Sequence, residues 1–145
     1  MNTYKALKDK HQAECNAFPL KFAFSQEQFD KAMTELGLKP KDTKKVTSIG
    51  YGGFTLNDNA PKWYALLSRQ ERECAEAIAN DIDGTGYIQE MWDYELANHE
   101  YIITCDISDA QSALGISDEQ LVNDKRIYNA MKRACKKQMD REDLW

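Results

Sequence analysis

The chain lacks the residue patterns that mark several familiar protein classes. Its four cysteines, Cys15, Cys74, Cys105 and Cys135, stand far apart and form no CxxC pair. This spacing indicates neither a zinc ribbon nor a secreted disulfide scaffold. No apolar run approaches the roughly 20 residues that span a bilayer, and the segment MNTYKALKDK contains no apolar signal core. We therefore expect a soluble cytoplasmic protein with reduced thiols.

Motifs for common catalytic and binding chemistry are also missing. The sequence has no GxSxG nucleophile motif and no GxxxxGK[ST] phosphate loop. The turn at residues 50–53 is rich in glycine, but it precedes a β-like segment, so it predicts a hairpin. Residues 81–88 resemble the first part of an EF-hand loop, yet the twelfth position is Trp92, which cannot coordinate calcium. Calcium binding is therefore not expected, and Asp81 is interpreted as a cap for the helix that follows.

Basic residues are nearly absent from the middle of the chain. Residues 71–120 contain thirteen Asp or Glu and one basic residue, Arg72, within a net charge of −5 for the whole chain. Such an acidic band discourages binding to a phosphate backbone and suits docking onto a basic nucleic-acid channel of another protein. A solvated helix face is the alternative interpretation. The candidate contact residues are Glu71, Glu73, Glu76, Asp81, Asp83, Glu90 and Asp93.

Apolar periodicity and turn signals predict a helix-rich α+β fold. We expect a single domain over residues 1–145, with about four to five helices and a small antiparallel sheet. Helices are predicted over 3–15, from Ser25 to Gly37, over 61–80 and 87–98, with a short turn of helix at 109–114. A final helix begins at Ser117, with Leu121, Tyr128, Met131, Cys135 and Met139 on its buried side. Strands are predicted at 20–24, 46–49, 54–56 and 101–107.

The two histidines each have a carboxylate one helical turn away, and these pairs are the main chemical signal. His11 pairs with Glu14, and Glu95 pairs with His99, each on an apolar helix stripe. Polar groups that face a core need a partner. These four side chains are therefore candidate ligands for one zinc ion. Cys15 and Glu100 are competing ligands, and two separate structural histidines are the alternative.

Two stretches carry a resemblance to a known group of proteins. One runs from Lys10-His11-Gln12 to Phe22-Ala23-Phe24-Ser25, and the other from Tyr94-Glu95-Leu96 to His99-Glu100-Tyr101. Most of the chain resembles a family of small uncharacterised proteins from phages, prophages and mobile elements of Gram-positive bacteria. This resemblance implies an anti-defence role, such as anti-CRISPR inhibition of an effector nuclease, but it supplies no catalytic residues.

These observations lead to one main functional prediction and two alternatives. The main prediction is a non-enzymatic inhibitor that binds a host protein with a basic surface, with Tyr51, Tyr64 or Trp145 as candidate apolar anchors. The first alternative is a metal-dependent enzyme that uses the His/Glu site with an open coordination position. The second is a nucleic-acid-binding module that uses the basic segments 39–45 and 132–137. The overall acidity argues against this last alternative.

Overall fold

The computed structural model describes residues 2–142, which form two compact units. Unit 1 contains residues 2–11 and 73–142, and unit 2 contains residues 12–72. The helices α1 (Thr3–Ala17) and α3 (Ala60–Asn80) contribute one part to each unit. The predicted helix-rich α+β class with a small antiparallel sheet is confirmed, although the described residues form eight α-helices, more than the four to five expected. The prediction of one domain for the whole chain stays a prediction.

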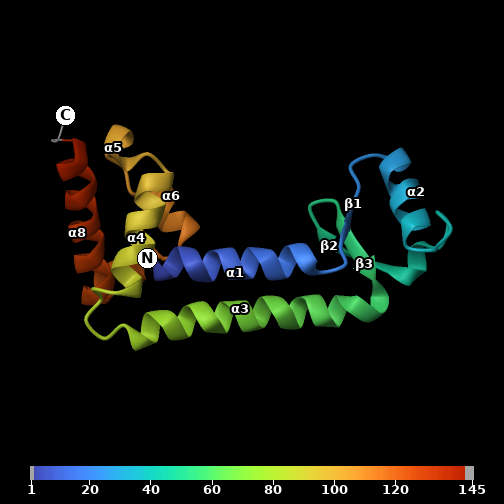
Figure 1. Ribbon diagram of the computed structural model, residues 1–145, viewed down its shortest axis with the longest axis horizontal. Helices are drawn as coiled ribbons and strands as arrows, with labels where there is room; N and C mark the ends of the chain where they lie inside the picture. Colours follow the sequence, from blue (N-terminus) through green and yellow to red (C-terminus); the bar gives the residue numbers. More distant parts are fainter. Residues whose placement is uncertain (1, 143–145) are drawn as a thin grey trace. The chain divides into compact units, whose positions relative to one another are not determined.

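Unit 2 packs a small sheet against one helix (Figure 1). Its strands are β1 (Lys21–Phe22), β2 (Val46–Gly50) and β3 (Gly53–Leu56), in the antiparallel order β1-β3-β2. Helix α2 (Gln26–Glu35) begins after Ser25, as predicted. The Ser25 side chain accepts a hydrogen bond from the Gln28 amide. The core that joins helix and sheet consists of Ala32, Met33 and Phe54. Two short 3₁₀ turns, at Thr43–Lys45 and Asn57–Asn59, flank the hairpin.

The β2–β3 hairpin forms at the predicted glycine-rich turn. Strands β2 and β3 pair antiparallel, with Thr47 opposite Thr55 and a register shift between Ser48 and Gly50. Gly50 and Gly52 both have positive φ, of 91° and 77°. Because an L side chain rarely adopts such a conformation, glycine is needed there to close the turn.

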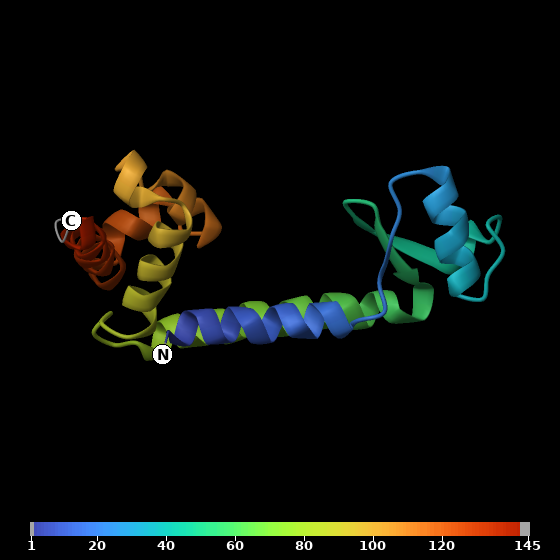
Figure 2. The same ribbon diagram turned by 45° about the horizontal axis from the view of Figure 1, so that its top comes forward.

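Unit 1 is a cluster of short helices around α4 (Tyr87–Asn98) and α8 (Lys125–Glu142), which lie side by side in both views (Figures 1 and 2). Its other elements are α5 (Tyr101–Thr104), α6 (Ser108–Ala113) and α7 (Asp118–Asn123). Trp92 on α4 is fully buried, and so are Ala130 and Ala134 on α8. Alanines in these positions let two helices approach closely. No helix of the part described here has both the length and the apolarity to span a membrane.

The predicted strand at 101–107 is wrong. Residues Tyr101–Thr104 form α5, and Cys105 then takes a left-handed conformation with φ of 55°. The β-branched residues of this segment favour a strand, but a strand also needs a hydrogen-bonded neighbour. The three-stranded sheet belongs to unit 2, whereas this segment belongs to unit 1. Tyr101, the first residue of α5, and Ile107, just before α6, pack against the core of unit 1.

The single final helix predicted after Ser117 is also wrong, because the chain forms two helices there. The capping box of Ser117 and Gln120 is present and begins α7. At Asp124 the backbone becomes extended, and the Asp124 carboxylate accepts a hydrogen bond from the amide of Arg126 at 3.0 Å. This cap begins α8 in a new direction, so that Ile127 is buried while Tyr128, predicted to be buried, is 40% exposed.

Candidate functional site

Glu95 is the most deeply buried charged side chain among those described, with a side-chain exposure of 1%. Its Oε1 atom lies 3.0 Å from Nζ of Lys8 on α1, which donates a hydrogen bond. Its Oε2 atom lies 3.5 Å from Nε2 of His99 on the next turn of α4. The predicted pairing of Glu95 with His99 is therefore present. Sequence reasoning missed Lys8, because helix periodicity within α4 carries no information about which side chain of α1 reaches it.

Aromatic rings surround the Lys8–Glu95 pair. The Lys8 ammonium lies 5.2 Å from the ring centroid of Tyr94 and 5.8 Å from that of Tyr4, within cation–π range. Burial, together with the charge and hydrogen bond of Glu95, raises the pKa of Tyr4 above its ordinary value. The Tyr4 hydroxyl therefore stays protonated at neutral pH. The Lys8 ammonium thus pairs with one oxygen of the buried carboxylate, while the other oxygen, Oε2, has no hydrogen-bond partner among the described residues.

His11 occupies a second polar cluster, formed by α1 and α3 within unit 1. Its Nε2 atom lies 3.1 Å from the Glu73 carboxylate, which also forms an ion pair with Lys10 at 3.2 Å. Its Nδ1 atom lies 4.0 Å from the sulfur of Cys74. The histidine is thus held by side chains more than 60 positions away in the sequence.

Glu14 lies on the part of α1 that belongs to unit 2. One of its carboxylate oxygens lies 2.5 Å from the guanidinium of Arg69, and the other accepts a hydrogen bond from Gln70 at 3.3 Å. Gln70 is buried and lies 3.7 Å from the sulfur of Cys15. Arg69 and Gln70 therefore satisfy the inward-facing carboxylate that the sequence predicted.

The structure does not assemble the predicted four-ligand metal site. Residues 2–142 contain no group of three or more His, Cys, Asp or Glu placed to hold a metal ion. Both predicted carboxylate ligands have cationic partners instead: Glu95 pairs with Lys8, and Glu14 pairs with Arg69. Zinc binding itself stays a prediction, which elemental analysis of the protein and its His11→Ala and His99→Ala variants would test.

Four of the seven predicted contact carboxylates are used inside the protein. Glu73 pairs with Lys10 and His11, and Asp93 pairs with Lys137 at 2.9 Å. Glu90 accepts hydrogen bonds from the amide and hydroxyl of Thr3, and Asp81 accepts hydrogen bonds from backbone amides. The remaining three, Glu71, Glu76 and Asp83, are exposed. The acidic band between 71 and 93 is therefore partly compensated, and its surface charge is lower than its composition indicates.

The loop before α4 confirms the capping role predicted for Asp81. The Asp81 carboxylate accepts hydrogen bonds from the amides of Gly84, Gly86 and Ile88, at distances of 2.9–3.3 Å. Amide donors at a helix start prefer an anionic acceptor. This carboxylate therefore helps to begin α4.

Exposed acidic charge gathers further along the chain, on α5, α6, α7 and the loops that join them. The segment 100–120 contains no lysine or arginine. Five carboxylates of this segment are exposed, and we call them the acidic surface: Glu100, Asp106, Asp109, Asp118 and Glu119. Ser108 lowers the pKa of Asp106 by donating hydrogen bonds through its hydroxyl and its amide. The sequence signal was the lack of basic residues in this segment, but our predicted contact residues stopped at Asp93.

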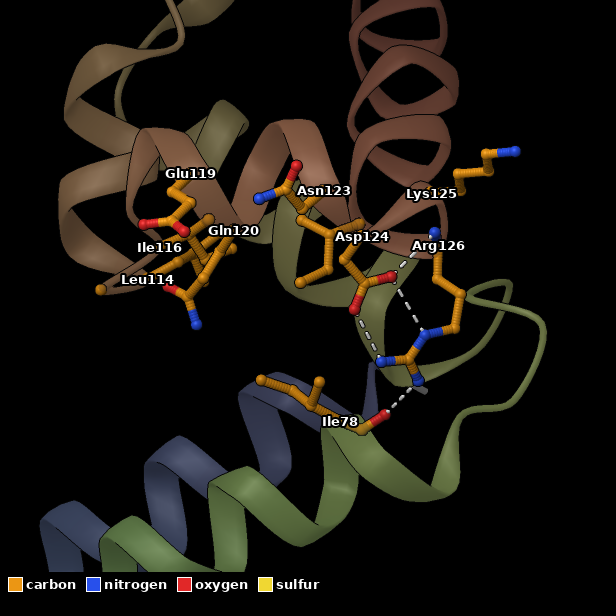
Figure 3. A pocket seen from close by; sticks show the side chains of 11 residues that line it. Ile78, Leu114, Ile116, Glu119, Gln120, Asn123, Asp124, Lys125 and Arg126 are labelled. Atoms are coloured by element: carbon orange, nitrogen blue, oxygen red, sulfur yellow. Dashed lines mark hydrogen bonds and ion pairs between the residues drawn. The ribbon is translucent and has the colours of Figure 1, made fainter.

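An open groove of about 690 Å³ lies beside the acidic surface within unit 1 (Figure 3). Its apolar lining comes from Ile78 at the end of α3, from the loop between α6 and α7, and from the start of α8. The apolar side chains are Ile78, Leu114, Ile116 and Ile127. Figure 3 shows Glu119 and Gln120 at one side of the groove and the Asp124–Arg126 ion pair at the other, with Nη2 and Oδ2 2.8 Å apart. We call this the α7 groove. Sequence reasoning missed it because the groove depends on the break at Asp124.

Two of the three predicted apolar anchors are exposed in the structure. Tyr51 is 96% exposed at the tip of the hairpin, and Tyr64 on α3 is 51% exposed. Trp145 lies outside the described residues. Both exposed tyrosines belong to unit 2.

Comparison with known proteins finds one family that covers most of the chain. The model of a family of unknown function (DUF7659) matches residues 3–137. No curated protein and no solved structure matches the chain.

Proposed function

The chain belongs to this family of unknown function, and from its own residues we propose that it is a non-catalytic binding protein that inhibits a host defence protein. We place it among the accessory proteins of phages and mobile elements, acting in the cytoplasm of the host bacterium. The resemblance of residues 10–25 and 94–101 to such proteins directs this choice of partner. A CRISPR effector nuclease is the first target to test, because it presents a basic channel for nucleic acid.

The acidic surface is the observation that carries this proposal. Its five carboxylates are exposed, and no cationic residue lies between positions 100 and 120. A surface of one charge sign attracts a partner of the opposite sign, raises the association rate and disfavours partners of like charge. A nuclease channel, lined by Lys and Arg for the phosphate backbone, supplies the opposite sign.

The α7 groove gives the same surface an apolar part. Glu119 belongs to both, since it is one of the five carboxylates and also lines the groove. Binding energy in protein interfaces concentrates where apolar side chains enter a pocket inside a polar rim. A basic segment with one apolar face therefore fits the groove and the acidic surface together.

The experiment compares two charge-neutralised variants in binding and nuclease-inhibition assays against a panel of CRISPR effectors. The test variant is Glu100→Gln/Asp109→Asn/Glu119→Gln, within the acidic surface. The control variant is Glu71→Gln/Glu76→Gln/Asp83→Asn, which makes the same change in net charge with exposed residues outside that surface. Circular dichroism before and after heating checks that both variants fold.

We expect the test variant to bind at least fivefold more weakly than the parent, because three interface charges contribute roughly 1–3 kcal/mol together at low salt. The control variant should stay within about twofold of the parent. If the control variant loses binding and the test variant keeps it, the interface lies in the band 71–93 and the acidic surface is wrong. If the parent neither binds nor inhibits any effector of the panel, inhibition of these nucleases is wrong.

A further inference from the structure

The charge of the chain is distributed unevenly between the two units. Residues 12–72, which form unit 2, contain nine Lys or Arg and seven Asp or Glu. The acidic excess of the whole chain therefore lies in the residues of unit 1. The negative net charge of the chain therefore does not exclude phosphate binding at unit 2, because binding depends on the local surface charge.

Three aromatic side chains are exposed around the hairpin turn of unit 2, and we call them the aromatic cluster. Phe22 is 53% exposed, Phe24 is 76% exposed and Tyr51 is 96% exposed. A Cβ atom on Gly52 would lie 2.7 Å from the Phe24 ring, and one on Gly53 would lie 2.9 Å from the Phe22 ring. Both phenylalanine rings therefore rest on glycine backbone while much of their surface faces solvent. Burying three such rings would be favourable, so their exposure indicates a binding surface.

A run of lysines precedes β2, and we call it the lysine segment. Residues 39–45 contain four lysines, Lys39, Lys41, Lys44 and Lys45, and all of them are exposed. The single acidic residue of the segment is Asp42, whose carboxylate accepts a hydrogen bond from the backbone amide of Lys39 at 3.0 Å. The segment therefore presents an excess of positive charge to solvent.

A groove of about 370 Å³ lies along β2, beside the lysine segment. It begins at Thr43, between the lysines, and passes Val46 and Ser48 of β2. It ends at Gly52, the glycine on which the Phe24 ring rests. Phe29 of α2 and Phe54 of β3 also line the groove, and their ring centroids are 5.1 Å apart. A chain that followed this groove would pass from Thr43 of the lysine segment to Gly52, beside the ring of Phe24. Phe22 and Tyr51 of the aromatic cluster line a second groove, of about 480 Å³.

We propose that this surface of unit 2 binds single-stranded nucleic acid. Exposed aromatic rings stack on unpaired bases of any sequence, and lysines neutralise the phosphates between them. A duplex keeps its bases stacked on one another and cannot offer their faces to Phe24 and Tyr51. The four lysines favour a polyanion over a neutral apolar peptide. This inference does not depend on the proposed inhibitor role, because it uses residues of unit 2 alone.

The test is fluorescence anisotropy with a labelled single-stranded oligonucleotide of about 20 nucleotides and mixed sequence, as DNA and as RNA, with the matching duplex for comparison. The full chain is titrated at several salt concentrations. One variant is Phe24→Ala/Tyr51→Ala, with Tyr64→Ala as its control, because Tyr64 is an exposed aromatic on α3. The other is Lys44→Gln/Lys45→Gln, with Lys132→Gln/Lys136→Gln on α8 as its control, because those lysines are exposed in unit 1.

The expected results differ between the two variants. Phe24→Ala/Tyr51→Ala should weaken binding at least tenfold, since loss of one stacked base costs about 1–3 kcal/mol, or roughly fivefold to 150-fold. Lys44→Gln/Lys45→Gln should reduce the slope of log K against log salt by about 1.4, which corresponds to two phosphates of a single strand. Both controls should stay within about twofold of the parent.

Three outcomes would overturn the proposal. One is no measurable binding of the parent at 50 mM salt, and another is equal affinity for single strand and duplex. The third is a loss of binding in the α8 control while the Phe24/Tyr51 variant binds as the parent does, which would move the nucleic acid to α8. Unchanged circular dichroism shows that a variant is folded. Unchanged binding of the proposed protein partner by Lys44→Gln/Lys45→Gln, which keeps all the predicted apolar anchors, separates this result from the inhibitor role.

Discussion

Removal of the Lys8 ammonium tests whether the buried Glu95 carboxylate depends on it. The structure places Lys8 Nζ 3.0 Å from Glu95 Oε1, while Glu95 is almost fully buried and Lys8 is 47% exposed. In Lys8→Met the methylene stem is largely kept and the charge is lost. The carboxylate then keeps His99, at 3.5 Å, as its neighbouring imidazole.

The magnitude follows from the burial of the two partners. Breaking a fully buried ion pair by removing one partner costs about 3–5 kcal/mol, because the other charge is left uncompensated. Lys8 is half exposed, so we expect a smaller cost, of about 2–3 kcal/mol, for Lys8→Met. Glu95→Gln keeps the shape and removes the charge, and it should cost about 1–2 kcal/mol. The double variant should be at least ~1 kcal/mol more stable than the sum of the two single effects predicts.

Urea unfolding followed by circular dichroism and by tryptophan fluorescence measures these differences. Lys5→Met is the matched control, because Lys5 lies on the same helix and pairs with Asp9, an exposed residue one turn away. An exposed pair of this kind contributes little to stability, because solvent screens it. If Lys8→Met costs no more than Lys5→Met, or if the Lys8 and Glu95 effects simply add, the buried pair does not stabilise unit 1 and the reasoning fails.

Three further predictions concern a helix cap, a glycine and an ion pair. Asp81→Ala removes the acceptor for the amides at the start of α4 and should lower stability by about 1–2 kcal/mol in urea unfolding. Gly52→Ala places a methyl group 2.9 Å from the Ala23 carbonyl at φ of 77°, and it should lower the thermal midpoint of unit 2, measured by circular dichroism, by several degrees. Arg126 lowers the pKa of Asp124, so this pair stabilises the fold above the unfolded pKa and is lost as pH falls. The stability difference between the parent and Asp124→Asn should therefore shrink below about pH 4, and its persistence at pH 2 would contradict the assignment.

Local signals in the sequence predicted the elements that are built from local contacts. Ser25 and Ser117 accept hydrogen bonds from amides three residues ahead, so each marks a helix start without help from the rest of the chain. The glycines at 50–53 similarly define the hairpin turn. The strand prediction for 101–107 was wrong because a strand needs a neighbouring strand to pair with, and the neighbours of this segment in unit 1 are helices.

The candidate sites depend on contacts that no local pattern reports. Spacing on α4 correctly paired Glu95 with His99, four residues apart. The partners of His11 and Glu14 instead come from α3, more than 50 residues away, and they became visible only once α1 and α3 were placed together within each unit. The α7 groove needs the break at Asp124, which we did not predict, although Asp124 and Lys125 are polar where a continuous stripe from Leu121 to Tyr128 would be apolar. Helix periodicity predicts which face of a helix is buried, but it does not predict which residues of other elements contact that face.

The sequence gives one net charge for the whole chain, whereas the fold distributes the charged side chains unevenly over its surfaces. The value of −5 argues against nucleic-acid binding only if every surface carries a share of it. Charges separated by more than about 8 Å at physiological salt are largely screened, so a phosphate on the lysine segment responds mainly to the lysines beside it. The salt dependence of oligonucleotide binding therefore counts locally neutralised phosphates, whatever the total charge of the chain. Glu73 and Asp93 add to the net charge but less to the surface potential, since lysines pair with them. We therefore expect the exposed charges to select the partners: cationic partners at the acidic surface on α5 to α7, and anionic partners at the lysine segment before β2.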